Sequence, residues 1–125
     1  MNEFAALIVT VIVFIMLDLV WFSISMKPIY EPTFLAVQGS PLNLRIAGGI
    51  AAWFLLAIGI RYFGIASGTK TTNFLRGALL GAIIYGVYNG TNYATLSNYP
   101  LNTAIADTMW GAFAVGLVTV ISSFL

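Results

Sequence analysis

The chain has 125 residues, of which 60% are hydrophobic and only 7% are charged. An ordinary soluble domain carries about 25% charged residues, so this chain has too little polar surface for a soluble monomer and is predicted to be an integral membrane protein. Cysteine and histidine are absent, which excludes disulfides, thiol catalysis, Cys/His metal sites and Ser-His-Asp triads, and a net charge of +1 gives no indication of a nucleic-acid partner.

Four segments are long enough to cross a membrane, because a bilayer core of about 30 Å takes roughly 20 apolar residues as a helix. They cover approximately residues 4–25, 44–63, 73–92 and 101–124. The sequence therefore predicts an all-α fold, a polytopic membrane protein built as a compact bundle of four transmembrane helices. Nothing in the composition divides the chain, so residues 1–125 are expected to form one domain with the lipid bilayer as its surroundings.

The first segment is expected to be a retained helix rather than a signal peptide. Glu3 is the only charge before its apolar run, and no small-x-small cleavage site follows it. Asp18 lies seven residues before the predicted end at Ser25, which places it about 10 Å below the membrane face. A carboxylate inside a span costs on the order of 3 kcal/mol, so Asp18 should face protein rather than lipid. Trp21 shares its helix face.

The connection after the first segment, residues 26–43, contains three prolines and is expected to be a loop outside the spans. Its TFLAVQ stretch is predicted to rest on the membrane interface. Arg45 begins the second segment, and its long side chain makes it the predicted partner of Asp18 or Asp107. Residues 64–72 are predicted to form a short polar turn.

The third segment carries a stripe that changes from small to polar along one helix face. Its members recur every three or four residues: Gly77, Gly81, Tyr85, Asn89 and Asn92. The glycine end predicts close packing of another helix. The Asn/Thr-rich run from 88 to 100 either caps this helix or reaches other helices. We expect Asn89 or Asn92 to bond to the first or fourth helix, and Tyr93, on another face, to anchor at the interface.

The fourth segment begins after Pro100, a residue that suits the start of a helix. Asp107 lies about 9 Å from the same membrane face as Asp18, and Trp110 follows three residues later, so Asp-x-x-Trp occurs twice, as DLVW and DTMW. All four helices thus bring polar groups to one leaflet. The predicted polar cluster consists of Asp18, Arg45, Asn89, Asn92 and Asp107, flanked by the aromatic residues Trp21, Tyr85, Tyr93 and Trp110. No catalytic residue or metal site is predicted, and the cofactor is left open.

Four spans place both termini on one side of the membrane, here called face A, and residues 26–43 and 93–100 on the other, face B. Face A carries Arg61, Lys70 and Arg76, whereas face B carries Lys27 and Arg45. Since positive residues favour the cytoplasmic side, this difference of one residue predicts cytoplasmic termini.

The sequence resembles a family of small predicted membrane proteins catalogued only as a domain of unknown function. The resemblance rests on FIMLDLVWF, on RGALLGAIIYGVYNGTNYATLSNYP and on DTMWG. The family pattern has Tyr-Asp-Leu-Thr-Asn-Tyr-Ala-Thr-Leu, where this chain has Asn89 and Gly90 in place of Asp and Leu. The resemblance implies a four-helix membrane protein and no particular activity. If that Asp titrates in relatives, Asn89 keeps the hydrogen bonds and loses the charge.

Three functions remain open from the sequence. The first is a small transporter or channel for a solute or ion, with the buried polar cluster as its site; four helices leave little room for a pathway unless the protein forms a homo-oligomer. The second is an accessory or assembly subunit of a larger hetero-complex, which the small size and short loops favour. The third, disfavoured, is an intramembrane enzyme in which the two Asp share a proton, because no Gly-x-Gly-Asp or Tyr-Asp protease motif flanks either residue.

Overall fold

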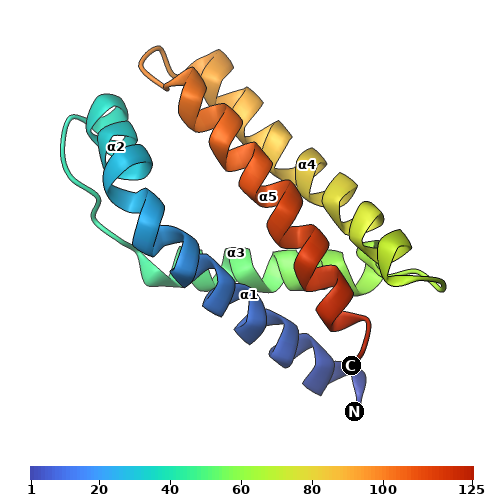
Figure 1. The fold of residues 1–125 in the computed structure, drawn as a ribbon. Coiled ribbons are helices and arrows are strands. Elements are labelled where there is room, and N and C mark those ends of the chain that lie inside the picture. The colour runs from blue at the N-terminus through green and yellow to red at the C-terminus, as the bar shows by residue number, and fades with distance from the viewer.

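The computed structural model describes residues 1–125 and contains helices and no strand, which confirms the predicted all-α fold (Figure 1). Its elements, in chain order, are α1 (Glu3–Ser25), η1 (Met26–Tyr30), α2 (Glu31–Gln38), α3 (Ile46–Gly59), η2 (Ile60–Gly64), α4 (Lys70–Thr95) and α5 (Leu101–Ser122). Three helical stretches are long and apolar enough to cross a membrane: Glu3–Gln38, Ile46–Gly64 and Leu101–Ser122. With 26 residues, α4 is long enough but is not among them.

The first helix does not stop where the sequence indicated. The expected loop at 26–43 is helical up to Gln38, and only residues 39–45 connect it to α3. Pro28 lies in the π-helical turn η1, and Pro32 lies in the first turn of α2, directly after it. Gly39 ends α2 with a left-handed backbone, φ 72°, and donates its N–H to the Leu35 carbonyl.

The two C-terminal helices, α4 and α5, form an antiparallel hairpin and lie side by side over their length (Figure 1). A Cβ atom at Gly81 would clash with the carbonyl oxygen of Gly111, and one at Gly77 would clash with Thr119. The glycine stripe of α4 therefore does what small residues do between membrane helices, which is to let two backbones approach closely.

The apolar core joins α1, η2 and α5. Its fully buried members are Phe14, Ile60, Ala114, Val115 and Val118. Helix α3 runs across α1 and α5 at a steep angle (Figure 1), and the chain termini lie together at the end that we call face A. The loop 96–100 lies at the opposite end, face B, from which residues 39–45 run back to the start of α3 (Figure 1).

Candidate functional site

Asp18 is held by two tryptophans that belong to two other helices. Its side chain is only 5% exposed. Trp53 of α3 donates its indole N–H to Oδ2 at 2.7 Å, and Trp110 of α5 donates to Oδ1 at 2.9 Å. Each carboxylate oxygen of Asp18 thus accepts one hydrogen bond from a rigid ring, and this residue ties α1 to both α3 and α5.

Asp107 is held in a second set of bonds nearer to face B. The Tyr30 hydroxyl donates to Oδ1 at 2.5 Å, and the Asn89 amide donates to Oδ2 at 2.7 Å. Each of these two donors also accepts a hydrogen bond. Trp21 donates its indole N–H to the Tyr30 hydroxyl at 3.0 Å, and the Tyr99 hydroxyl donates to Oδ1 of Asn89 at 2.6 Å. Because the Tyr30 oxygen accepts from Trp21, its own proton is directed to the Asp107 carboxylate.

The two Asp-x-x-Trp motifs interlock where α1 and α5 meet. The indole rings of Trp21 and Trp110 stack with centroids 4.7 Å apart and planes 5° from parallel. Trp110, which follows Asp107, donates to Asp18, while Trp21, which follows Asp18, donates through Tyr30 toward Asp107. Each helix thus supplies one carboxylate; the tryptophan of α5 bonds directly to Asp18, whereas the tryptophan of α1 acts on Asp107 only through Tyr30.

The donors to both carboxylates are all neutral. We call the eight residues joined here the carboxylate network: Asp18, Trp21, Tyr30, Trp53, Asn89, Tyr99, Asp107 and Trp110. An unpartnered charge in a low-dielectric interior is very unfavourable, whereas a carboxylate that accepts two good hydrogen bonds is tolerated. Burial raises the pKa of the Tyr99 hydroxyl, so this group at the outer edge of the network remains a neutral donor. No buried side-chain polar atom lacks a partner.

Arg45 does not join the network, so its predicted pairing with Asp18 or Asp107 is wrong. The residue is exposed at the start of α3 and takes part in no side-chain hydrogen bond or ion pair. Since the first helical stretch continues through η1 and α2 to Gln38 and α3 crosses α1 steeply, the start of α3 is exposed and Trp53, two turns further on, meets Asp18 instead. Asn92 is half-buried, and Tyr93 is exposed.

Tyr85 supports the network through its backbone and its ring. Its carbonyl oxygen accepts a second hydrogen bond from the Asn89 amide at 2.9 Å. Its ring occupies the space beside Gly111, where a Cβ atom would clash with it. Asn89 therefore makes the cross-helix contact that the polar stripe of α4 led us to expect, while the carbonyl of Tyr85 fixes its orientation.

Sequence reasoning did not place Trp53, Tyr30 or Tyr99 in the cluster. The sequence does carry a signal for Trp53, because this tryptophan lies inside a span rather than at its ends, where interfacial tryptophans gather. For Tyr30, the neighbouring prolines favour a loop and give no signal of a buried partner. Tyr99 follows α4 in the short connection, and only the folded hairpin brings it back to Asn89.

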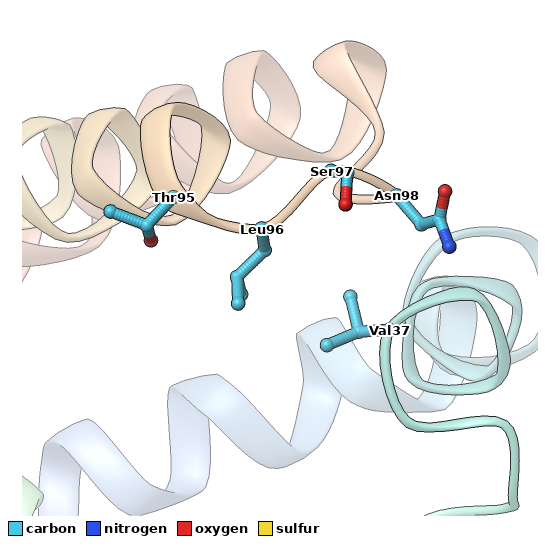
Figure 2. Close-up of a pocket in the computed structure, with 5 residues that line it drawn as sticks. All are labelled: Val37, Thr95, Leu96, Ser97 and Asn98. Carbon is cyan, nitrogen blue, oxygen red and sulfur yellow. The ribbon is translucent and has the colours of Figure 1, made fainter.

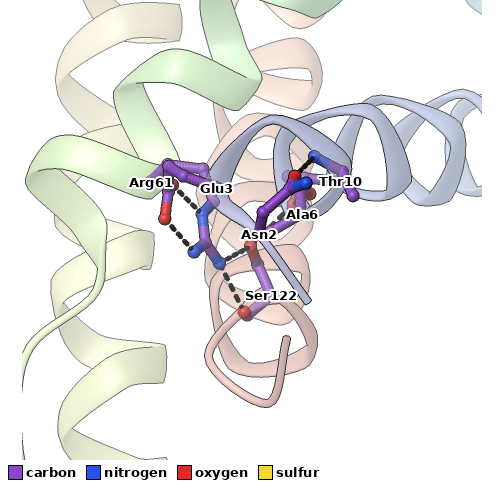
Figure 3. Close-up of polar contacts among 7 residues, drawn as sticks. Asn2, Glu3, Ala6, Thr10, Arg61 and Ser122 are labelled. Carbon is purple, nitrogen blue, oxygen red and sulfur yellow. Dashed lines mark hydrogen bonds and ion pairs between the residues drawn. The ribbon is translucent and has the colours of Figure 1, made fainter.

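A different polar cluster closes the face A end of the bundle (Figure 3). Arg61 of η2 forms a two-pronged ion pair with Glu3, at 2.8 and 2.9 Å, and donates to the carbonyl oxygen of Ser122 at 2.8 Å. The Ser122 hydroxyl also bonds to Thr10 at 2.7 Å. We call these four residues the terminal cluster; it binds the first helix, the end of the second span and the end of α5 together.

An apolar plug separates the two polar clusters. Asp18 and Thr10 are eight residues apart on α1, which is about 12 Å, and Phe14 lies between them with no exposed surface. Toward face B the polar contacts continue, because the hydroxyls of Thr33 and Thr103 bond at 2.6 Å one turn beyond Tyr30 and Asp107. Further out lies a groove of about 150 Å³ lined by Val37 and residues 95–98 (Figure 2).

The carboxylates are not arranged as a catalytic pair or as metal ligands. Asp18 and Asp107 share no hydrogen bond, since each oxygen accepts from a different aromatic or amide donor. An aspartyl dyad requires two carboxyls that share a proton. No group of three or more acidic residues is close enough to hold a metal ion.

Comparison with known proteins gives a family but no activity. No curated protein and no solved structure matches the chain. One family model matches residues 4–124, nearly the whole chain, and its description reads predicted membrane protein. Together with three helices able to cross a bilayer, this match establishes an integral membrane protein: the chain belongs to the family of predicted membrane proteins DUF2177.

Proposed function

We propose that this protein is an accessory or assembly subunit, a small bundle that docks onto another helical chain within the membrane. In this proposal the whole chain is one four-helix domain, and α4 crosses the bilayer together with α5 because the two are paired over their length. The carboxylate network holds the bundle in shape. The weak positive bias of face A favours cytoplasmic termini.

The observation that carries this proposal is the unpartnered first half of α3. Residues 46–52, with the sequence IAGGIAA, are exposed except for half-buried Gly49. A Cβ atom at Gly48 would meet nothing within 4 Å. In membranes, helix pairs form through small residues that allow close backbone contact, and elsewhere in this chain such residues are already covered, as at Gly77 and Gly81. The small-residue face of α3 therefore fits a helix from another chain.

The closed interior agrees with a subunit rather than a pathway. Every buried polar side-chain atom has a partner within the chain, and the plug around Phe14 interrupts the polar groups between the two faces. A permeation route needs polar groups that can exchange their partners for a solute or for water.

The test is co-purification from native membranes after chemical crosslinking, comparing Gly48→Leu with Gly90→Leu. Both glycines are exposed on helices with open space around them, so either change should leave the fold intact. We expect the wild type and Gly90→Leu to retain one distinct membrane partner, and Gly48→Leu to lose it. A chain that purifies as a monomer, or only as a homo-oligomer, would contradict the subunit role.

Transport is the second candidate, and one observation favours it. The hydroxyl pair Thr33–Thr103 lies one turn from the bond between Tyr30 and Asp107 on the face B side, so polar groups continue from Asp107 toward face B. Reconstituted vesicles would show a proton or cation flux that Asp107→Asn abolishes and Glu31→Gln does not. Equal flux through vesicles without protein would exclude this function.

A further inference from the structure

A second groove lies on the outer surface between η2 and α4, and a cation, Arg76, lies at its end. It has a volume of about 190 Å³, and its lining residues are Phe63, Arg76, Leu79, Leu80 and Ile83. Four of the five are apolar. Neither the carboxylate network nor the small-residue face of α3 includes any of them.

The positions of these residues give the groove a direction. Arg76, Leu79, Leu80 and Ile83 are spaced i, i+3, i+4, i+7 on α4, so they form one stripe of that helix. The stripe runs about 10 Å from the guanidinium toward the middle of the helix. Arg76 is near the face A end of α4, and because α4 lies along the apolar helix α5, the leucines and Ile83 lie at the depth of lipid hydrocarbon.

The guanidinium at the end of the groove has unused donors. Arg76 donates one hydrogen bond, to the Phe63 carbonyl oxygen at 3.2 Å, and it forms no ion pair. An arginine has five N–H donors and remains charged. At the boundary of a bilayer, the available anion is a lipid phosphate, and a guanidinium matches its geometry with two parallel hydrogen bonds.

We infer that this groove is a binding site for one anionic phospholipid, with the phosphate on Arg76 and an acyl chain along Leu79, Leu80 and Ile83. Charge complementarity supports this occupant over a zwitterionic lipid, since Arg61 on the same face is already neutralised by Glu3 whereas Arg76 is not. Phe63 forms the opposite wall and gives the acyl chain a second apolar surface.

The experiment is native mass spectrometry of the purified chain in mild detergent micelles that contain phosphatidylglycerol or phosphatidylcholine. One basic residue near an anionic lipid contributes roughly a fivefold preference. We expect the wild type to retain one phosphatidylglycerol about fivefold more than phosphatidylcholine. Arg76→Gln should abolish this preference, and Ile83→Trp, which fills the groove, should lower the retention of both lipids.

Arg45→Gln is the matched control, because it removes an exposed arginine at the opposite end of the molecule and should leave the preference unchanged. Arg76→Lys keeps the positive charge and should keep most of the preference for phosphatidylglycerol. This second variant tests the same site even if Arg76→Gln folds poorly. Equal retention of the two lipids by the wild type, or an unchanged preference in Arg76→Gln, would overturn the site.

Discussion

The two ends of this bundle stabilise acidic side chains in opposite ways. In the terminal cluster, Glu3 is 58% exposed and is paired with a full positive charge on Arg61. In the carboxylate network, Asp18 is 5% exposed and is bound only by neutral indole N–H groups. An ion pair buried at depth must desolvate two ions, whereas neutral donors leave only one to desolvate. The acidic side chain that water can reach is thus paired with a charged partner, and the one that water cannot reach is bound by packed aromatic donors.

The largest expected effect is that of Asp18→Asn, which disrupts the carboxylate network. The amide presents an NH₂ group to one of the two indole N–H donors, which leaves a buried donor without a partner. We expect the free energy of unfolding, measured by SDS titration in mixed micelles, to fall by about 3 kcal/mol. Glu31→Gln, the same chemical change at an exposed position, should have little effect. Equal losses in both variants would show that the neutral donors of Asp18 are unimportant.

A smaller loss of stability is expected for Asn89→Leu, which removes the side chain that links Asp107 to Tyr99. This change takes one donor from Asp107 and the acceptor from the Tyr99 hydroxyl, and should lower the free energy of unfolding by about 2 kcal/mol. Asn98→Leu, at an exposed loop position, serves as the control and should be tolerated. If the same titration gives identical curves for the two variants, the cross-helix role of Asn89 is rejected.

The stability that the terminal cluster provides should depend on salt concentration, whereas the stability that the carboxylate network provides should not. Glu3→Gln removes the carboxylate of an exposed ion pair, so we expect only a small fall in melting temperature at low salt. The Debye length falls to about 3 Å at 1 M salt, so charge interactions at the surface are screened. The wild type and Glu3→Gln should therefore have the same melting temperature at that salt concentration. Melting curves of Asp18→Asn should stay below the wild type at every salt concentration. A salt-independent effect of Glu3→Gln would contradict the comparison.

The smallest effect is expected for Arg45→Leu, which tests whether face B needs a cation at all. Because Arg45 is exposed and unpaired, its replacement should change the free energy of unfolding by less than about 0.5 kcal/mol. The SDS titration used for the other variants measures this change. A loss of several kcal/mol would mean that the guanidinium reaches a carboxylate in the membrane and that the network is not held by neutral donors alone.

Composition and spacing were enough to predict the class of protein and the inward orientation of its acidic residues. With 7% charged residues the chain has no alternative to the bilayer, and helices are the structures by which such a chain satisfies its own backbone there. The cost of a carboxylate in hydrocarbon is what makes Asp18 and Asp107 inward-facing, and the spacing of Gly77 and Gly81 is what marks the close contact with α5.

Which groups meet those carboxylates depends on how the helices cross in the folded chain. Spacing along a helix fixes a face but not the angle at which another helix crosses it, so nothing local distinguished Arg45 from Trp53 as the partner of Asp18. The prolines of residues 26–43 favoured a loop, yet one π turn lets the helix pass Pro28 and carry Tyr30 to Asp107. Both outcomes depend on contacts between segments far apart in the chain, where packing and hydrogen bonds outweigh local preference.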